Sequence, residues 1–261
     1  MAPIFLPDLR LNIRLDGPED GPPLVLLHAL GLNLSLWDGL VAHLPRHRIL
    51  RIDMRGHGAS DMPPAPYAMG SLIRDTERAM DHTGMREAVV LGLSIGGLIA
   101  QGLAVKRLDL VRGLVLSNTA ARIGHASQWQ QRIETVRQGG LPALHDAMME
   151  RWLGRSWRSN PALPGLSQMF LSGSAEGWMG CAAAIAGTDF YETTATLRLP
   201  ALVIAGGNDG STPPDLVRET ADLIPGHRFH LIRGAGHIPM AEKPGDYALA
   251  LRDFLTAIGH G

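Results

Sequence analysis

The stretch from Ala88 to Ala100 constrains the fold of this chain most, because it changes from a strand pattern to a helix pattern at one serine. Its first four residues form a continuous apolar run with two valines, which is typical of a strand buried on both faces of a parallel sheet. After Ser94 the apolar residues follow the spacing of one helix face, at Ile95, Leu98, Ile99 and Leu103. The sequence therefore predicts a strand that turns sharply into a helix.

Glycines on both sides of the serine allow this turn, because they have no Cβ to collide with the strand or the helix. Gly92, Ser94 and Gly96 fit the pattern G-x-S-x-G, in which a serine hydroxyl is exposed above the end of a sheet. The first N–H groups of the following helix have no partner within that helix, and its dipole favours negative charge there. We therefore predict Ser94 as a nucleophile and the N–H of Ile95 as a donor to an oxyanion.

A serine nucleophile needs a base that accepts its proton and a carboxylate that holds this base in one tautomer. Asp209 and His237 each lie in a glycine-containing loop after a strand pattern, and they follow Ser94 in the order serine, acid, histidine. We predict a catalytic triad of these three residues. The loop after the apolar run 24–27 offers a second backbone donor for an oxyanion, which we predict to be the N–H of Leu30.

Short apolar runs alternate with helix patterns, which predicts an α/β fold with a mostly parallel, eight-stranded sheet flanked by helices. The runs comprise residues 4–6, 11–15, 24–27, 49–52, 88–91, 113–117, 201–205 and 228–232. From 119 to 199 the pattern is helical, so we expect a helical cap inserted after the sixth strand. Residues 1–118 and 200–261 then form one core, and the cap is an insertion rather than an independent domain.

Composition excludes several classes of partner. The 261 residues have a net charge of −1, which gives no electrostatic footprint for nucleic acid or for an anionic membrane. Cys181 is the only cysteine, so neither an intrachain disulfide nor a thiolate metal cluster is possible. The H-E-x-x-H, Walker A and G-x-G-x-x-G patterns are missing, so we predict no metal and no cofactor. Without a signal-peptide pattern or an apolar stretch of about 20 residues, we expect a cytoplasmic protein.

These motifs resemble those of the α/β-hydrolase superfamily over nearly the full chain. The likeness rests on the turn 92–97, the segment Asp53–Ser60, the acid loop ending in Asp209, and the pair Gly236-His237. Within the superfamily the chain is most similar to 3-oxoadipate enol-lactonases of bacterial aromatic catabolism, through residues 30–37, residues 117–124 and Trp129. The resemblance implies that Ser94 attacks a lactone carbonyl, that His237 takes and returns the proton, and that Asp209 orients the histidine.

The resemblance also implies a small-molecule ester or lactone substrate that carries a carboxylate. Its pocket should then hold a cation or a strong hydrogen-bond donor. Three arginines of the early cap are candidates for this role, namely Arg122, Arg132 and Arg137, and Trp129 is expected to form an apolar wall.

Other functions fit the same residues. A general carboxylesterase and a cofactor-free perhydrolase would use the same triad, the second with peroxide in place of water. A small-molecule receptor could retain the triad without appreciable turnover. A halide-releasing hydrolase is disfavoured, because it would need a carboxylate at position 94.

Overall fold

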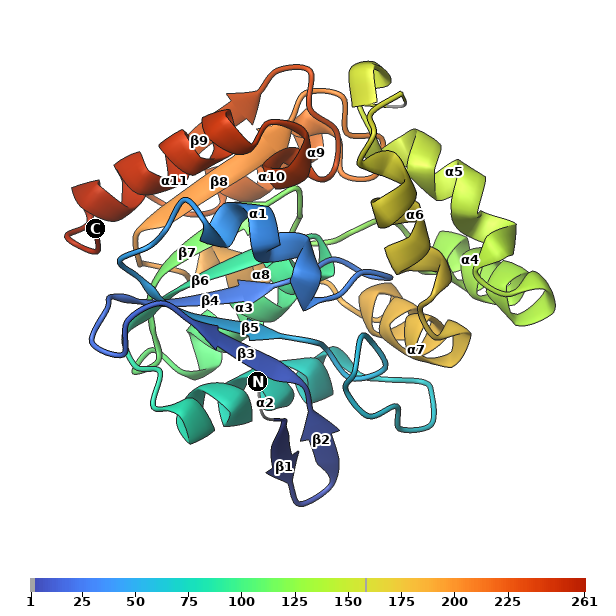
Figure 1. The fold of residues 1–261 in the computed structure, drawn as a ribbon, viewed down its shortest axis with the longest axis horizontal. Coiled ribbons are helices and arrows are strands. Elements are labelled where there is room, and N and C mark those ends of the chain that lie inside the picture. Colours follow the sequence, from blue (N-terminus) through green and yellow to red (C-terminus); the bar gives the residue numbers. More distant parts are fainter. Residues whose placement is uncertain (1–2, 158) are drawn as a thin grey trace.

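The computed structural model describes residues 3–157 and 159–261, and a seven-stranded sheet lies at its centre (Figure 1). The strand order is β3-β5-β4-β6-β7-β8-β9, and neighbouring strands are parallel except for β3 with β5. In chain order the strands are Ile13–Asp16 (β3), Pro23–Leu27 (β4), Arg48–Ile52 (β5), Ala88–Leu93 (β6), Val111–Ser117 (β7), Ala201–Gly206 (β8) and Arg228–Ile232 (β9). Because β4 to β9 run in one direction, the loops that follow them gather at one edge of the sheet.

Helices lie on both faces of this sheet; Figure 1 shows α1 and α11 in front of it and α3 behind it. Every residue of β6 and β8 is buried, as expected for parallel strands covered on both sides. The helices of this part are η1 (Leu34–Trp37), α1 (Asp38–Val41), α2 (Met69–Thr83), α3 (Ile95–Lys106), α9 (Pro214–Asp222), α10 (Pro239–Glu242) and α11 (Pro244–Ala257). The predicted parallel sheet flanked by helices is confirmed.

The prediction of eight strands in one sheet is wrong at its N-terminal end. The first predicted strand, Ile4–Leu6 (β1), pairs with Leu9–Leu11 (β2) in a separate antiparallel hairpin. The second predicted strand, 11–15, divides at Asn12, whose N–H donates to Ser60 Oγ at 2.9 Å and whose carbonyl accepts from the Asp53 N–H at 3.0 Å. These bonds turn the chain, so only β3 joins the main sheet, antiparallel to β5.

Between β7 and β8 the described residues form helices and no strand. They are α4 (Ala126–Gly139), α5 (Pro142–Trp152), η2 (Arg155–Trp157), α6 (Leu163–Leu171), α7 (Ala175–Ala186) and α8 (Tyr191–Ala195). Helices α4 to α7 stand together beside the carboxyl ends of the strands, whereas α8 lies against α3 of the core (Figure 1). We call α4 to α7 the cap; they follow β7, the sixth strand of the sequence prediction.

No helix in the described part of the chain is long and apolar enough to cross a membrane. Across residues 3–157 and 159–261, the His, Cys, Asp and Glu side chains form no group of three that could hold a metal ion. Cys181 is free and buried in α7, and its burial raises the pKa of the thiol.

Candidate active site

Ser94 occupies the sharp turn between β6 and α3 that its sequence predicts. Its backbone has φ 57° and ψ −118°, a conformation that costs a non-glycine residue about 1–3 kcal/mol. A Cβ at Gly92 would lie 2.1 Å from the Gly96 carbonyl oxygen, and a Cβ at Gly96 would lie 2.4 Å from the carbonyl oxygen of Leu27. Both glycines are therefore required by close backbone packing, which holds the strained serine in place.

The predicted acid and base form a buried pair. Asp209 follows β8, His237 follows β9, and the carboxylate Oδ2 of Asp209 lies 2.7 Å from Nδ1 of His237. The side chain of each residue is at most 2% exposed. Because Asp209 takes up Nδ1, the imidazole presents Nε2 as its other nitrogen, which is the atom that a serine hydroxyl requires as a base.

Asp209 remains ionised although it is buried. Burial alone would raise the pKa of the carboxyl, but the nearby His237 and the hydrogen bonds from His237, Asn118 and Thr212 hold this pKa below its usual value. The Thr212 hydroxyl donates to Oδ2 at 2.7 Å, and the Ser211 N–H donates to Oδ1 at 2.7 Å. The pair can therefore stabilise an imidazolium when His237 accepts a proton.

Asn118 supports this pair, and sequence reasoning assigned it no role. Its side-chain amide donates to Asp209 Oδ2 at 2.8 Å and to the Gly236 carbonyl at 3.1 Å, so it joins the acid loop to the histidine loop. Its backbone has φ 44°, a left-handed conformation that asparagine tolerates better than most residues. An asparagine directly after the strand ending at Ser117 was the available signal.

The two predicted oxyanion donors are backbone groups of buried residues, Leu30 and Ile95. Ile95 is the first residue of α3, so its N–H has no acceptor one turn earlier in the helix. In the loop after β4, the Gly31 N–H donates to His57 Nε2 at 2.9 Å and the Leu32 N–H to the Ala29 carbonyl at 3.2 Å. The N–H groups of Gly31 and Leu32 therefore already have acceptors, and Leu30 remains our predicted donor in this loop.

His28 and His57 set the shape of this loop, in agreement with their interpretation as loop residues that form hydrogen bonds. His28 Nε2 accepts from the Met54 N–H at 3.0 Å, and His57 Nε2 accepts from Gly31. Burial lowers the pKa of His28 to about 4; burial and repulsion by His28 lower that of His57 to about 3. Both rings are therefore neutral at pH 7 and act as acceptors.

We expect the free energy of unfolding to decrease as the pH falls from about 6.5 towards 4. In the unfolded chain His28 and His57 take up protons near pH 6.5, whereas in the fold they stay neutral to about pH 4 and 3. Protons favour the unfolded chain in this window, by about 2 kcal/mol for each histidine at pH 5. Urea unfolding at two pH values checks this, and His57→Gln should lose less stability than the wild type over the same interval. An equal loss in both proteins would contradict the role given to His57.

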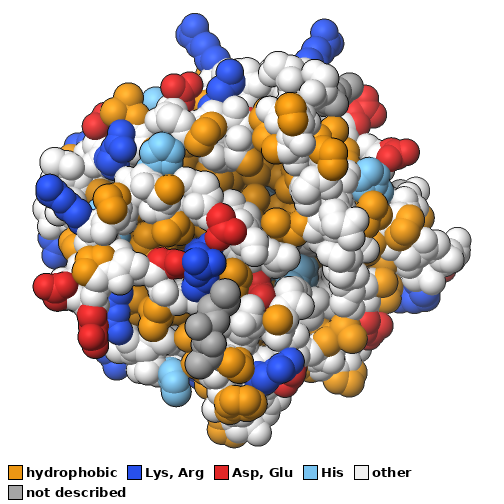
Figure 2. Space-filling model, viewed as in Figure 1, with side chains coloured by type: hydrophobic (Ala, Val, Ile, Leu, Met, Phe, Trp, Pro, Cys, Tyr) orange, Lys and Arg blue, Asp and Glu red, His pale blue; other side chains and the backbone are white. Residues whose placement is uncertain are grey.

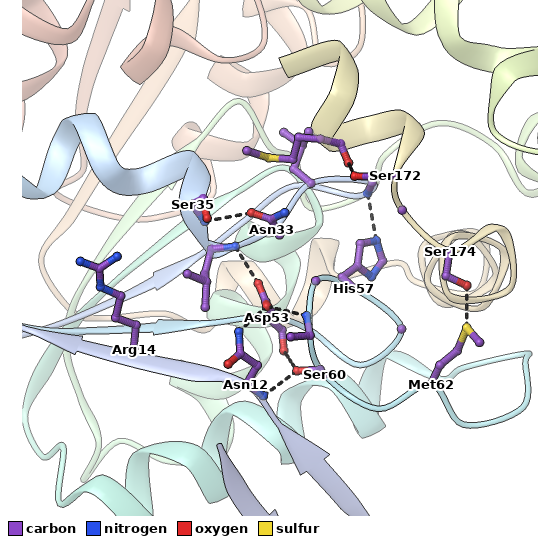
Figure 3. A pocket seen from close by; sticks show the side chains of 18 residues that line it. Asn12, Arg14, Asn33, Ser35, Asp53, His57, Ser60, Met62, Ser172 and Ser174 are labelled. Carbon is purple, nitrogen blue, oxygen red and sulfur yellow. Dashed lines mark hydrogen bonds between the residues drawn. The ribbon is translucent and has the colours of Figure 1, made fainter. Parts of the chain in front are cut away.

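A cavity of about 570 Å³ adjoins the other side of this loop, where the core meets the turn between α6 and α7 (Figure 3). Its lining includes His57 and Asp53 but none of Ser94, Asp209 and His237. The Asp53 carboxylate in its wall accepts from the Leu34 N–H at 2.7 Å and the Ala59 N–H at 2.9 Å. These hydrogen bonds join the loop after β5 to the start of η1, and the cavity lies outside the candidate triad.

Figure 2 shows hydrophobic side chains gathered between the core and the cap, beside α6. Trp152, the last residue of α5, is buried, and its ring stacks on the His237 imidazole with centroids 6.0 Å apart. Phe170 of α6 meets the Trp152 ring edge-on at 5.6 Å. The cap therefore packs aromatic rings against His237.

The four residues predicted to bind substrate differ in their surroundings. Trp129 is buried and donates to the Ile123 carbonyl at 2.6 Å. Arg122 lies 3.5 Å from Asp189, and Arg137 pairs with Glu134. Arg132 is half-buried 4.6 Å over the Trp129 ring, and no ion pair to it is found among the described residues. Burial and the nearby Arg151 lower the pKa of Arg132.

The fold, the serine turn and the acid–histidine pair together define an α/β hydrolase. The chain belongs to the alpha/beta hydrolase fold family, whose model matches residues 22–244. The fold predicted from the sequence is thereby confirmed.

Enol-lactonases are among its relatives. The 3-oxoadipate enol-lactonase 2 of Acinetobacter baylyi is 36% identical over 243 residues, which cover 91% of this chain and 90% of the relative. The solved enol-lactonase of Burkholderia xenovorans LB400 matches with a TM-score of 0.94 and 34% identity, over 98% of this chain and 100% of that one. A malate-bound esterase from Thermogutta terrifontis matches with a TM-score of 0.90 and 29% identity, over 96% and 94% of the two chains. These findings confirm the resemblance to enol-lactonases.

Proposed function

We propose that this carboxylic ester hydrolase opens an enol-lactone that carries a carboxylate, such as 3-oxoadipate enol-lactone, through an acyl-enzyme on Ser94. The observation that carries the proposal is the 2.7 Å bond between Asp209 and His237, on loops at the sheet edge where Ser94 follows β6. The enol-lactonase relatives, at 36% and 34% identity, support the choice of substrate class.

In the proposed mechanism, the Ser94 hydroxyl attacks the lactone carbonyl while His237 Nε2 accepts its proton. The N–H groups of Leu30 and Ile95 stabilise the negative oxygen of the tetrahedral intermediate, and each such donor contributes about 3–4 kcal/mol in comparable enzymes. Collapse breaks the ring C–O bond, and the imidazolium returns the proton to the leaving enol oxygen. Because the ring is one molecule, the leaving group stays attached to the acyl chain. Water then attacks the ester with His237 as base, which releases the product and restores Ser94.

Arg132 is the arginine that we propose for the substrate carboxylate. It stacks on Trp129 and lies near Arg151, whose guanidinium donates to the Gly210 carbonyl, next to Asp209. Arg122 and Arg137 already have acidic neighbours. A half-buried guanidinium over an aromatic ring would gain most from a carboxylate partner, because charge-assisted bonds strengthen as water is excluded.

Replacing Arg132 with methionine is expected to raise KM for a carboxylate-bearing lactone by about 10- to 100-fold, the effect of one hydrogen bond to a charged group. The same variant should hydrolyse a neutral lactone at close to the wild-type rate. Arg122→Met and Arg137→Met provide matched comparisons on the same cap and should change KM less. Equal kinetics for the wild type and Arg132→Met on the anionic lactone would contradict this assignment.

A substrate panel tests the proposed function. It compares lactones with and without a carboxylate, p-nitrophenyl acetate, and acetate with hydrogen peroxide, and reports kcat/KM for each. The proposal predicts the highest value for the carboxylate-bearing lactone. A preference for p-nitrophenyl acetate would favour a general carboxylesterase, and peracid formation above lactone hydrolysis would favour a perhydrolase. No turnover of any member would favour the receptor alternative.

A further inference from the structure

One short segment of the cap contacts both loops that carry the candidate acid and base. We call residues Arg151–Gly154, at the end of α5, the α5 strap. The Arg151 carbonyl accepts from the Gly210 N–H at 2.9 Å, and the Arg151 guanidinium donates to the Gly210 carbonyl at 2.8 Å. The Trp152 carbonyl accepts from the His237 N–H at 2.5 Å. The strap therefore bridges the acid loop and the histidine loop through backbone groups.

Glu242, the last residue of α10, accepts hydrogen bonds from both the α5 strap and the histidine loop. Its carboxylate Oε2 accepts from the Gly154 N–H at 2.9 Å, and Oε1 accepts from the Gly236 N–H at 2.8 Å. Gly154 belongs to the strap, and Gly236 directly precedes His237. The residue is only 7% exposed, so water is largely excluded from these bonds, and each is stronger than a surface bond.

The strap and the histidine loop touch too closely to move independently. A Cβ at Gly236 would lie 2.1 Å from the Trp152 carbonyl oxygen, and one at Gly154 would lie 2.4 Å from the Gly234 carbonyl oxygen. Within this close packing, the Trp152 ring stacks on the His237 imidazole at an interplanar angle of 20°. The Trp152 ring therefore lies beside the imidazole that Asp209 holds through Nδ1.

We propose that Glu242 is a positioning residue: its carboxylate fastens the α5 strap to the His237 loop and so couples the placement of the cap to the orientation of the catalytic imidazole. The inference rests on the proposed function, because it assumes that His237 is the base for Ser94. Glu242 acts through Gly154 and Gly236 and touches neither substrate nor reacting atoms. A carboxylate suits this position because both of its oxygens accept hydrogen bonds, whereas a glutamine amide would direct a donor at one of the two N–H groups.

Glu242→Gln tests the proposal, because it keeps the size of the side chain and removes one acceptor. We expect kcat for lactone hydrolysis to fall about 10- to 100-fold with KM nearly unchanged, as for a misplaced catalytic group. The low-field proton NMR signal of His237 Nδ1–H, assigned by its loss in His237→Gln, should shift or broaden. Wild-type kcat together with an unchanged His237 signal would overturn the proposal, whatever the change in Tm.

Asp75→Asn is the matched control for loss of a buried carboxylate. Asp75 is 3% exposed, and its carboxylate accepts two hydrogen bonds from the Arg55 guanidinium, at 2.6 and 2.7 Å. We expect this variant to lower Tm and to leave the His237 signal unchanged; a signal shift as large as that in Glu242→Gln would overturn the proposal by tracing both shifts to lost stability.

Arg151→Met is a second variant, in case Glu242→Gln does not fold. The Arg151 residue is exposed, and its replacement removes the 2.8 Å bond to Gly210 together with a positive charge near Arg132, so kcat is compared on a neutral lactone. We expect a smaller fall in kcat than in Glu242→Gln, with a shift of the His237 signal in the same direction. An unchanged signal would contradict the proposal that the α5 strap positions His237. Ser94→Ala separates the two claims: if it retained full turnover, the proposed function would fail, while the NMR signal would still report on the positioning of His237.

Discussion

Replacing Ser94 with alanine is expected to lower kcat for lactone hydrolysis by about 10⁵- to 10⁶-fold, the effect of removing the nucleophile from a serine triad. The fold should survive, because no hydrogen bond from the Ser94 side chain caps α3 and the turn is held by backbone contacts. Steady-state kinetics on the carboxylate-bearing lactone measure the effect, and an unchanged Tm shows that folding is intact.

Ser172→Ala is the control for this experiment. Ser172 is an exposed serine between α6 and α7, and its hydroxyl is 3.3 Å from the Met169 carbonyl. We expect wild-type kcat for this variant. If Ser94→Ala were as active as Ser172→Ala, the hydroxyl of Ser94 would not be the nucleophile.

Replacing Asp209 with asparagine is expected to lower kcat by about 10³- to 10⁴-fold, with a smaller change in KM. The carboxylate accepts from His237, Asn118 and Thr212, so an amide at this position would direct N–H groups at existing donors. His237 would then lose the partner that fixes its tautomer and stabilises its charged form.

Asp215→Asn provides the comparison for Asp209→Asn. Asp215 is an exposed acid in the first turn of α9, only a few residues further along the same loop region. We expect its replacement to leave kcat unchanged. A similar loss of kcat in both variants would mean that Asp209 has no special role as the acid.

The sequence was sufficient for the part of the site that depends on local geometry. The turn at Ser94 is encoded by Gly92 and Gly96, because a Cβ at either would clash with backbone at 2.1 or 2.4 Å. The carboxyl ends of parallel strands share one edge, so the strand patterns also placed Asp209 and His237 at that edge. The cap helices follow their own apolar periodicity, and α4 to α7 all form where helix patterns predict them.

Contacts between distant segments could not be predicted in this way. The separate hairpin of β1 and β2 arises because bonds from Asn12 to Ser60 and Asp53 interrupt a continuous strand pattern. The bridge from Glu242 to Gly154 joins residues 88 positions apart, and neither lies in a motif of its own. Periodicity reports which face of an element is buried but not which backbone amide a buried carboxylate will meet.

The same distinction applies to the three candidate arginines. Arg122, Arg132 and Arg137 are alike in sequence, each in a helical or turn region rich in polar residues. Two of their neighbours, Glu134 for Arg137 and Trp129 for Arg132, lie three residues earlier on α4 and can be read from the sequence, whereas Asp189 beside Arg122 is shown only by the structure. The proposal for the substrate carboxylate therefore depends on the partial burial of Arg132 and on its closeness to Arg151, which the sequence pattern does not show.

Covalent labelling shows directly whether the Ser94 hydroxyl is the nucleophile. The protein is treated with a fluorophosphonate, which reacts with activated serine nucleophiles, and peptide mass spectrometry locates the label while lactone hydrolysis is followed in parallel. We predict one phosphonyl group on the peptide that contains Ser94, loss of activity in proportion to labelling, and protection by the carboxylate-bearing lactone. Complete labelling of Ser94 with activity retained, or complete inactivation with the label on another residue, would contradict this prediction.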